Sequence, residues 1–369
     1  MNRFECISTP QIKLHGRYSE YAGAAAFYWT GSGIELVTDS SELWLEYETA
    51  FTSCEQWIAL EIDGSLVSRQ MLLCSGRLCI FRGMSKGTKK EVRIYKDTQP
   101  MGSDETSYLL FRAVSADGEL FDTAERAMRI EFVGDSLTTG EGLVGAQCEM
   151  DWIPMFFSSI GNYAVKTAKL LNADFRIMSQ GGWGVLCGWN NDPNLVIPKH
   201  YENVCTVVGG ETFEKLGAHE KNDFSAWQPD YIVVNLGTND EGAMDQPAWK
   251  DEETGESFEL MPQKDEAGFT SACEKVLAAA VGFLNKLHAL NPAAHIIWAY
   301  GMCGHKLENT LRSAVDEFNK ALENNIAAFI LLPSATEDKL GSRSHPGAQV
   351  HAEAAQMIAG RIKELSENK

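Results

Sequence analysis

The chain has 369 residues, of which 44% are hydrophobic and 22% are charged, and this composition is typical of a folded protein with one large domain or two ordinary ones. Its 51 acidic and 32 basic side chains give a formal net charge of −19, which repels phosphate backbones and anionic lipid surfaces. We therefore expect no nucleic acid and no membrane among its partners.

The N-terminal segment, residues 1–10, contains no apolar run of signal-peptide length, and no stretch approaches the roughly 20 apolar residues of a membrane span. Nine cysteines without an export signal predict reduced thiols in a cytoplasmic protein. The closest pair, Cys74 and Cys79, does not have zinc-site spacing and lacks a second pair, so we expect no bound metal. The sequence leaves the oligomeric state open.

The first third of the chain has the period of β structure. Leu43, Leu45 and Tyr47 alternate with glutamates, as in a strand with one buried face. Residues 58–62 repeat the alternation and end in the turn signal Asp63-Gly64, and further short strands are expected near residues 92–94 and 109–111. No amphipathic helix interrupts residues 1 to about 120. These features predict an all-β sandwich of jelly-roll type over residues 1–125.

After this segment, strand and helix patterns alternate. We expect strands at residues 130–133, 175–178, 231–236 and 295–300, and helices at residues 163–171, 272–290, 315–324 and 350–365. The strands are largely apolar runs, which is typical of a parallel sheet covered on both faces. Residues 126–369 are therefore predicted to form a three-layer α/β domain with a mostly parallel sheet.

Four short segments lie at predicted strand ends or strand–helix junctions. Open α/β sheets gather their sites at this edge, so we expect the four segments to converge. They are Gly134-Asp135-Ser136-Leu137, Gly181-Gly182-Trp183-Gly184, Gly237-Thr238-Asn239-Asp240 and Ser344-His345-Pro346-Gly347.

Their residue types fit acyl transfer. A serine hydroxyl such as that of Ser136 is a weak nucleophile and needs a positioned base, and an imidazole such as that of His345 titrates near neutrality. The oxyanion of the tetrahedral intermediate needs aligned donors, for which the candidates are the backbone amides of Ser136 and Gly182 and the side-chain amide of Asn239.

Each segment also has a purely structural interpretation. Gly-Asp-Ser is a common turn, Gly-Thr-Asn-Asp can be a turn with a helix cap, and His345 can be a structural residue at a helix start. Asp135 is a candidate substrate contact, with loop holding as the alternative. Trp183 and Trp189 are candidate platforms for an apolar sugar face, with core or interface packing as the alternative. The order and context of all four segments favour catalysis.

The segments resemble the SGNH or GDSL hydrolases, whose defining Ser, Gly, Asn and His match Ser136, Gly182, Asn239 and His345. Residues 134–142, 192–194 and 223–230, together with the sandwich, resemble carbohydrate esterase family two over nearly the whole chain. This resemblance implies removal of acetyl groups from xylan-type and other plant polysaccharides, without a metal or organic cofactor.

One position departs from the family pattern. The aspartate usually found three residues before the histidine is replaced by Ser342. The resemblance then implies a Ser–His dyad in which a backbone carbonyl orients the imidazole, and the natural sugar stays open.

The function expected is that of a serine esterase which removes acetyl groups from acetylated xylo- or gluco-oligosaccharides through an acetyl-enzyme on Ser136. The alternatives are a GDSL esterase, thioesterase or lipase acting on non-sugar acyl groups, and a non-catalytic carbohydrate-binding protein on the same scaffold.

Overall fold

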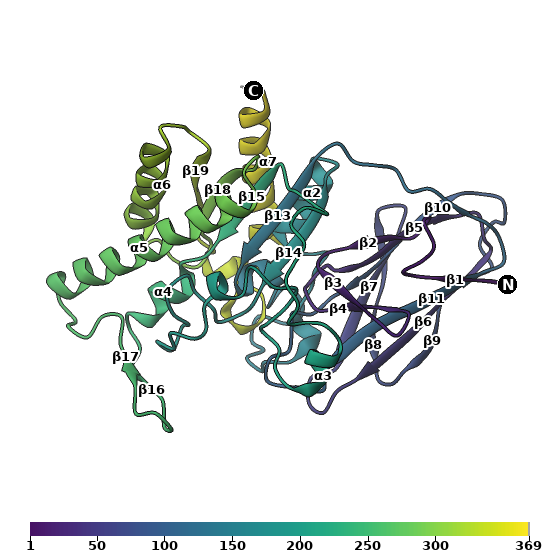
Figure 1. Cartoon of the computed structure of the whole chain (residues 1–369), viewed down its shortest axis with the longest axis horizontal. Helices are drawn as coiled ribbons and strands as arrows, with labels where there is room; N and C mark the ends of the chain where they lie inside the picture. Colours follow the sequence, from purple (N-terminus) through teal and green to yellow (C-terminus); the bar gives the residue numbers. More distant parts are fainter. Residues whose placement is uncertain (368–369) are drawn as a thin grey trace.

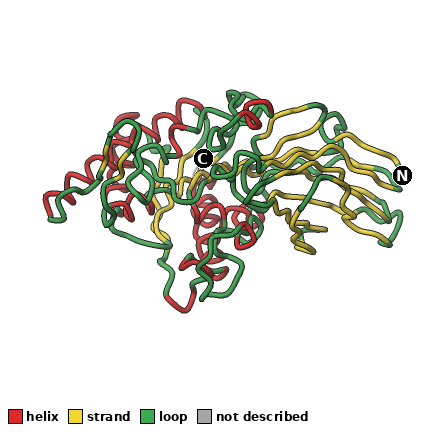
Figure 2. The backbone as a smooth tube through the Cα atoms, turned by 90° about the horizontal axis from the view of Figure 1, so that it is seen from below, coloured by secondary structure: helices red, strands yellow, loops and turns green. Residues whose placement is uncertain are grey.

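The computed structural model describes residues 1–367 and contains a β sandwich and an α/β domain that lie side by side (Figure 1). Figure 2 shows the sandwich strands gathered at the N-terminal end of the molecule, with the helices at the other end. The predicted fold class is confirmed. The sandwich strands end at Phe121 and the α/β strands begin at Arg129, so the domain boundary expected after residue 125 falls in the connection between them.

The sandwich consists of two six-stranded antiparallel sheets. One contains β1(Asn2–Glu5), β3(Tyr18–Tyr21), β4(Ala24–Phe27), β6(Glu42–Ala50), β9(Gly76–Arg82) and β11(Tyr108–Ala116). The other contains β2(Lys13–His15), β5(Gly33–Thr38), β7(Gln56–Ile62), β8(Ser65–Leu72), β10(Lys90–Lys96) and β12(Leu120–Phe121). Leu43 and Leu45 are buried between the sheets, as the alternation in the sequence predicts.

The α/β domain has a five-stranded parallel sheet in the order β14-β13-β15-β18-β19. Its strands are β13(Arg129–Gly134), β14(Asp174–Ser179), β15(Tyr231–Asn235), β18(His295–Gly301) and β19(Ala327–Leu332). Its helices are α1(Ser136–Thr139), α2(Tyr163–Leu170), α3(Glu211–Lys215), α4(Thr238–Ala243), α5(Glu266–Leu290), α6(Glu308–Leu322) and α7(Ala348–Glu367). A hairpin of β16(Trp249–Lys250) and β17(Ser257–Phe258) projects before α5 (Figure 1).

Both faces of the parallel sheet are covered, which explains the apolar runs in its strands. Ile232 and Val234 pack in one cluster with α5 and α6, whereas Tyr231 and Val233 pack in another with α2 and α7. Among the described helices, α5 is long and apolar enough to cross a membrane by length and composition. The buried side chains of α5 pack in the hydrophobic core between this helix and the parallel sheet.

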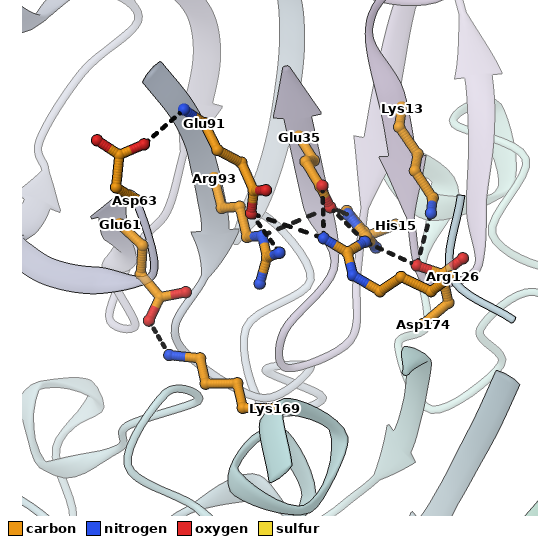
Figure 3. A network of polar contacts seen from close by, with 10 residues as sticks. All are labelled: Lys13, His15, Glu35, Glu61, Asp63, Glu91, Arg93, Arg126, Lys169 and Asp174. Carbon is orange, nitrogen blue, oxygen red and sulfur yellow. Dashed lines mark hydrogen bonds and ion pairs between the residues drawn. The ribbon is translucent and has the colours of Figure 1, made fainter. Parts of the chain in front are cut away.

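A buried polar network joins the two domains (Figure 3). The carboxylate of Glu35 on β5 accepts hydrogen bonds from His15 Nε2 at 2.8 Å and from both terminal nitrogens of Arg126, at 2.7 and 3.0 Å. Arg126 also donates to Asp174 on β14 at 2.9 Å. Burial disfavours the Glu35 carboxylate, but the hydrogen bonds from His15 and Arg126 outweigh it and lower the pKa of Glu35. These contacts hold the sandwich against the sheet that carries the site.

Candidate active site

Ser136 lies directly after β13, at the first position of the short helix α1. The Asp135 side chain caps this helix by accepting a hydrogen bond from Leu137 N at 3.0 Å. Gly134 is required here, because a Cβ at this position would lie 2.0 Å from Thr138 Oγ1. The tight turn leaves the nucleophile candidate at the carboxyl edge of the parallel sheet, as the sequence predicts.

His345 faces this serine from the loop before α7. Its Nε2 lies 3.0 Å from Ser136 Oγ, and its Nδ1 lies 2.9 Å from the backbone oxygen of Arg343. Because a carbonyl oxygen only accepts, Nδ1 must carry the proton in the neutral ring, and Nε2 is left with a lone pair toward the serine hydroxyl. The ring therefore has the tautomer that a general base needs.

The carbonyl of Arg343 takes the place of the missing carboxylate. Arg343 and Ser344 both have a φ of 55°, the left-handed conformation that turns this carbonyl toward the ring. Ser342, which replaces the usual aspartate, instead donates its hydroxyl to Val144 O at 2.9 Å. The expected arrangement of a dyad with a backbone carbonyl is the one that the geometry favours.

The glycine turn after β14 packs against Ser136. A Cβ on Gly181 would lie 3.4 Å from Ser136 Cβ, so the turn approaches the serine closely. Gly182 has a φ of 81°, which favours glycine, and the structure gives its N–H no acceptor among the described residues. This N–H and that of Ser136, which has no partner within the helix, remain candidate oxyanion donors.

Asn239 lies in the first turn of α4, after β15. Its Nδ2 donates to Trp183 O at 2.9 Å and to Asp135 Oδ2 at 3.1 Å. Both amide hydrogens are therefore engaged, and one of these bonds must be exchanged before Asn239 can donate to an oxyanion. Through these two hydrogen bonds, the Asn239 side chain links three of the four predicted segments.

Asp135 has no exposed surface, and burial raises its pKa to about 7. Because its oxygens face Leu137 N and Asn239, the geometry favours loop holding over the predicted contact with substrate. Asp240 holds a second loop, because its carboxylate accepts from the backbone N–H groups of Val185, Leu186 and Cys187 at 2.8 to 3.1 Å.

Comparison with known proteins places the chain in a family. It is 39% identical to an acetyl xylan esterase from the rumen bacterium Butyrivibrio proteoclasticus, over 100% of both chains and with a TM-score of 0.95. A family two carbohydrate esterase from Clostridium thermocellum, solved with cellohexaose, has the same fold at 20% identity, with a TM-score of 0.79 and coverage of 96% and 99% of the two chains. The chain belongs to carbohydrate esterase family two.

The curated relatives of this family two protein are longer chains. It is 28% identical over 235 residues to the cellulase/esterase CelE of Acetivibrio thermocellus, which corresponds to 63% of this chain and 27% of CelE. It is 32% identical over 115 residues to an acetylxylan esterase / glucomannan deacetylase of Cellvibrio japonicus, 30% of this chain and 29% of that protein. It thus matches less than a third of the length of these two relatives. No family model matches the chain.

Glu141 is a polar residue of this family two site that the sequence argument missed. Its side chain is almost fully buried, with Oε1 2.8 Å from Arg343 Nε and 4.0 Å from His345 Nε2. Arg343 also donates to Met150 O at 2.8 Å. The same arginine therefore holds His345 through its carbonyl and Glu141 through its guanidinium. Two features of the sequence could have indicated Glu141. It lies five residues after Ser136, and the aspartate usually found three residues before the histidine is absent.

Replacing Glu141 by glutamine is expected to lower kcat about tenfold, because a carboxylate at this distance would stabilise a positive charge on the ring of a catalytic His345. Glutamine retains an oxygen for Arg343, so the loop keeps its geometry. The measurement is kcat on nitrophenyl acetate, with the exposed Asp338→Asn as the control that leaves kcat unchanged. An unchanged kcat in Glu141→Gln, or a loss matched by Asp338→Asn, contradicts this role.

The sandwich contributes one wall of a groove beside the glycine turn that packs against Ser136. The groove has a volume of about 340 Å³ and is lined by residues of both domains, among them Gln99, Ser103, Trp152, Gly181 and Trp183. Gln99 also accepts a hydrogen bond from Gly181 N at 2.8 Å. The two domains therefore build the site together.

A buried lysine fixes this wall. Lys96 Nζ donates to Thr98 Oγ1 at 2.6 Å and to the backbone oxygens of Thr98 and Gln99, both at 3.0 Å. Burial lowers the pKa of Lys96 to about 7. Lys96 therefore fixes the conformation of the loop from which Gln99 accepts the hydrogen bond of Gly181 N–H.

The two predicted tryptophans differ in exposure. Trp183 is only 9% exposed and its ring lies 4.8 Å from that of His200, although it lines the groove. Trp189 is 51% exposed, and its Cδ1 would lie 3.1 Å from a Cβ on Gly182. Trp183 therefore lines the groove with little exposed surface, whereas Trp189 exposes its ring beside the glycine turn. Among residues 1–367, no cluster of three or more His, Cys, Asp or Glu side chains has a metal-binding arrangement.

Proposed function

We propose that this protein removes acetyl groups from acetylated carbohydrates of the xylo- or gluco-oligosaccharide type. The observation that carries the proposal is the 3.0 Å contact of Ser136 Oγ with His345 Nε2, in a ring whose Nδ1 is held by a carbonyl. The similarity to an acetyl xylan esterase over the full length of both chains supports the substrate class.

In the first half of the reaction, Ser136 Oγ attacks the acetyl carbonyl carbon while His345 Nε2 takes the hydroxyl proton. The oxyanion is stabilised by the N–H groups of Ser136 and Gly182 and by Asn239. The tetrahedral intermediate collapses when its bond to the sugar oxygen breaks, and that oxygen receives the proton from His345. The products are the deacetylated sugar and an acetyl ester on Ser136.

In the second half, water replaces the sugar. His345 takes a proton from the water as its oxygen attacks the acetyl carbon, and the intermediate collapses with loss of Ser136 Oγ. The proton returns to the serine, and acetate leaves. Arg343 O accepts from Nδ1–H throughout, and the Glu141 carboxylate balances the transient positive charge of the ring.

The space beside the nucleophile favours a short acyl group. A Cβ on Gly181 would lie only 2.9 Å from Glu141 Oε2 and 3.1 Å from Gln99 Oε1, so two polar side chains pack against the turn beside Ser136. An esterase, thioesterase or lipase for long acyl chains needs an apolar channel instead. A purely carbohydrate-binding protein has no need for a hydrogen-bonded base and nucleophile.

The test compares nitrophenyl acetate, butyrate and octanoate with acetylated xylo- and gluco-oligosaccharides. We expect kcat/KM to fall by about a hundredfold or more from acetate to octanoate, and acetate to be released from the saccharides. Equal or better activity on octanoate without release from any saccharide would assign the protein to non-sugar acyl groups.

A further inference from the structure

A second groove continues from the first onto the sandwich. It has a volume of about 510 Å³ and is lined by β7, β8 and sandwich loops on one side and by residues 152–155 of the α/β domain on the other, among them Glu55, Trp57, Met71, Trp152 and Met155. Ser103 and Trp152 line both grooves, so the two spaces meet at these residues. The path therefore leads from the glycine turn beside Ser136 to the outer strands of the sandwich.

Trp57 is fixed at the far end of this path. Its indole Nε1 donates to Glu55 at 2.9 Å, and the guanidinium of Arg69 lies 5.4 Å from the ring centre. Arg69 is itself held across the domain interface, where it pairs with Asp97 and donates to Met155 O at 3.2 Å. Because these contacts order the indole in advance, a ligand does not have to immobilise it.

The lining suits a chain of sugar rings. Trp57 and Trp152 are half-buried rings, and Met71 and Met155 are 44% and 38% exposed, which gives apolar surface for the faces of sugar rings. Ser103 and Glu55 add acceptors for hydroxyl groups at the edges.

We propose that the two grooves form one binding track, in which a saccharide chain with its acetylated residue at Ser136 passes Trp152 and reaches Trp57 on the sandwich. The inference rests on the proposed function and adds a distal subsite at Trp57 of the N-terminal domain. Its occupant is the part of the same substrate chain that leaves the catalytic groove, because the two grooves share Ser103 and Trp152 as lining residues.

The test measures KM and kcat for acetylated xylo-oligosaccharides of about two and about six units, together with nitrophenyl acetate. We expect Trp57→Ala to raise KM for the long substrate about fivefold, the usual contribution of one ring-stacking contact, with kcat unchanged. The short substrate and nitrophenyl acetate keep their wild-type constants, and Trp57→Phe retains most of the affinity for the long one.

Trp44 offers a matched control in the other sheet. Its Nε1 donates to Glu42 at 2.6 Å, and Arg77 lies 5.4 Å from its ring centre, yet it lines neither groove. Trp44→Ala therefore removes an equivalent indole and leaves all constants unchanged. Met71→Lys, at an exposed position, obstructs the track without touching the core and gives the same selective rise in KM if Trp57→Ala does not fold.

The outcomes separate this inference from the proposed function. If the wild type has equal KM values for the short and the long oligosaccharide, the distal subsite is wrong, and the proposed deacetylase function stands. The same conclusion follows if Trp57→Ala and Met71→Lys leave the KM for the long oligosaccharide unchanged. An equal loss on nitrophenyl acetate also overturns the subsite, because that substrate cannot reach Trp57. If the wild type releases no acetate from any saccharide, both proposals fail.

Discussion

Replacing Ser136 by alanine is expected to abolish acetate release, with kcat lower by about four orders of magnitude or more. The hydroxyl of Ser136 is the nucleophile that lies 3.0 Å from the ring nitrogen able to take its proton. Without it, His345 retains its place but has only water to activate, at a carbon positioned for a different attacking atom. Binding of the saccharide is expected to persist, because the grooves are unchanged.

The measurement is acetate release from an acetylated oligosaccharide, paired with labelling by a fluorophosphonate. The wild type should be labelled on Ser136 and the Ser136→Ala variant should not. Ser344→Ala is the control, because Ser344 is an exposed hydroxyl beside His345 that faces Met150 Sδ at 4.0 Å. Turnover close to that of the wild type in Ser136→Ala would rule out the acyl-enzyme, and absence of labelling would favour the carbohydrate-binding alternative.

The main features of the fold were predictable because each leaves a local pattern. Leu43 and Leu45 are buried between the less buried Glu42, Trp44 and Glu46, because only one face of β6 is covered. The strand Tyr231–Asn235 is largely apolar because both of its faces are covered. The helix starts were less accurate. The structure begins α5 at Glu266, before the predicted residue 272, although Asp265 caps it by accepting from Gly268 N at 2.8 Å.

Two other elements left a weaker signal. The structure begins α6 at Glu308, before the predicted residue 315, and its N-cap residue Leu307 makes no capping hydrogen bond. The edge strand Ala327–Leu332 was not predicted at all, and its burial shows no alternation between two faces. Boundaries of this kind are set by packing partners elsewhere in the chain, which a local window does not contain.

The residues of the site also differ in how far a local sequence pattern predicts them. The four segments were visible because three of them follow strand ends and the fourth precedes a helix. The fold then brings the segments of Ser136, Asn239 and His345 together. The orientation of His345 depends on a backbone carbonyl, which every residue possesses, so no residue type marks it. Gln99 reaches the site from another domain, across a sequence separation that no motif records.

Replacing Asn239 by alanine is expected to lower kcat about a hundredfold with little change in KM, the effect of losing one oxyanion donor. In the resting geometry its two amide hydrogens go to Trp183 O and Asp135 Oδ2. A charged oxyanion is a stronger acceptor than a neutral carbonyl, so the exchange of one bond is favourable only as the intermediate forms. Such an interaction raises kcat and leaves ground-state binding nearly unchanged.

The control is Thr238→Ala on the same helix turn, which removes a buried hydroxyl that has no hydrogen-bond partner among the described residues.

A second variant, Asp135→Asn, separates a direct role of Asn239 in catalysis from an indirect one. If Asn239 acts only by holding Asp135, whose pKa burial raises to about 7, then Asp135→Asn reproduces the loss of kcat. If Asn239 donates to the oxyanion, Asp135→Asn keeps most of kcat while Asn239→Ala does not. A change confined to KM would instead assign Asn239 to substrate binding, because an interaction equally strong before and during the reaction cannot accelerate it.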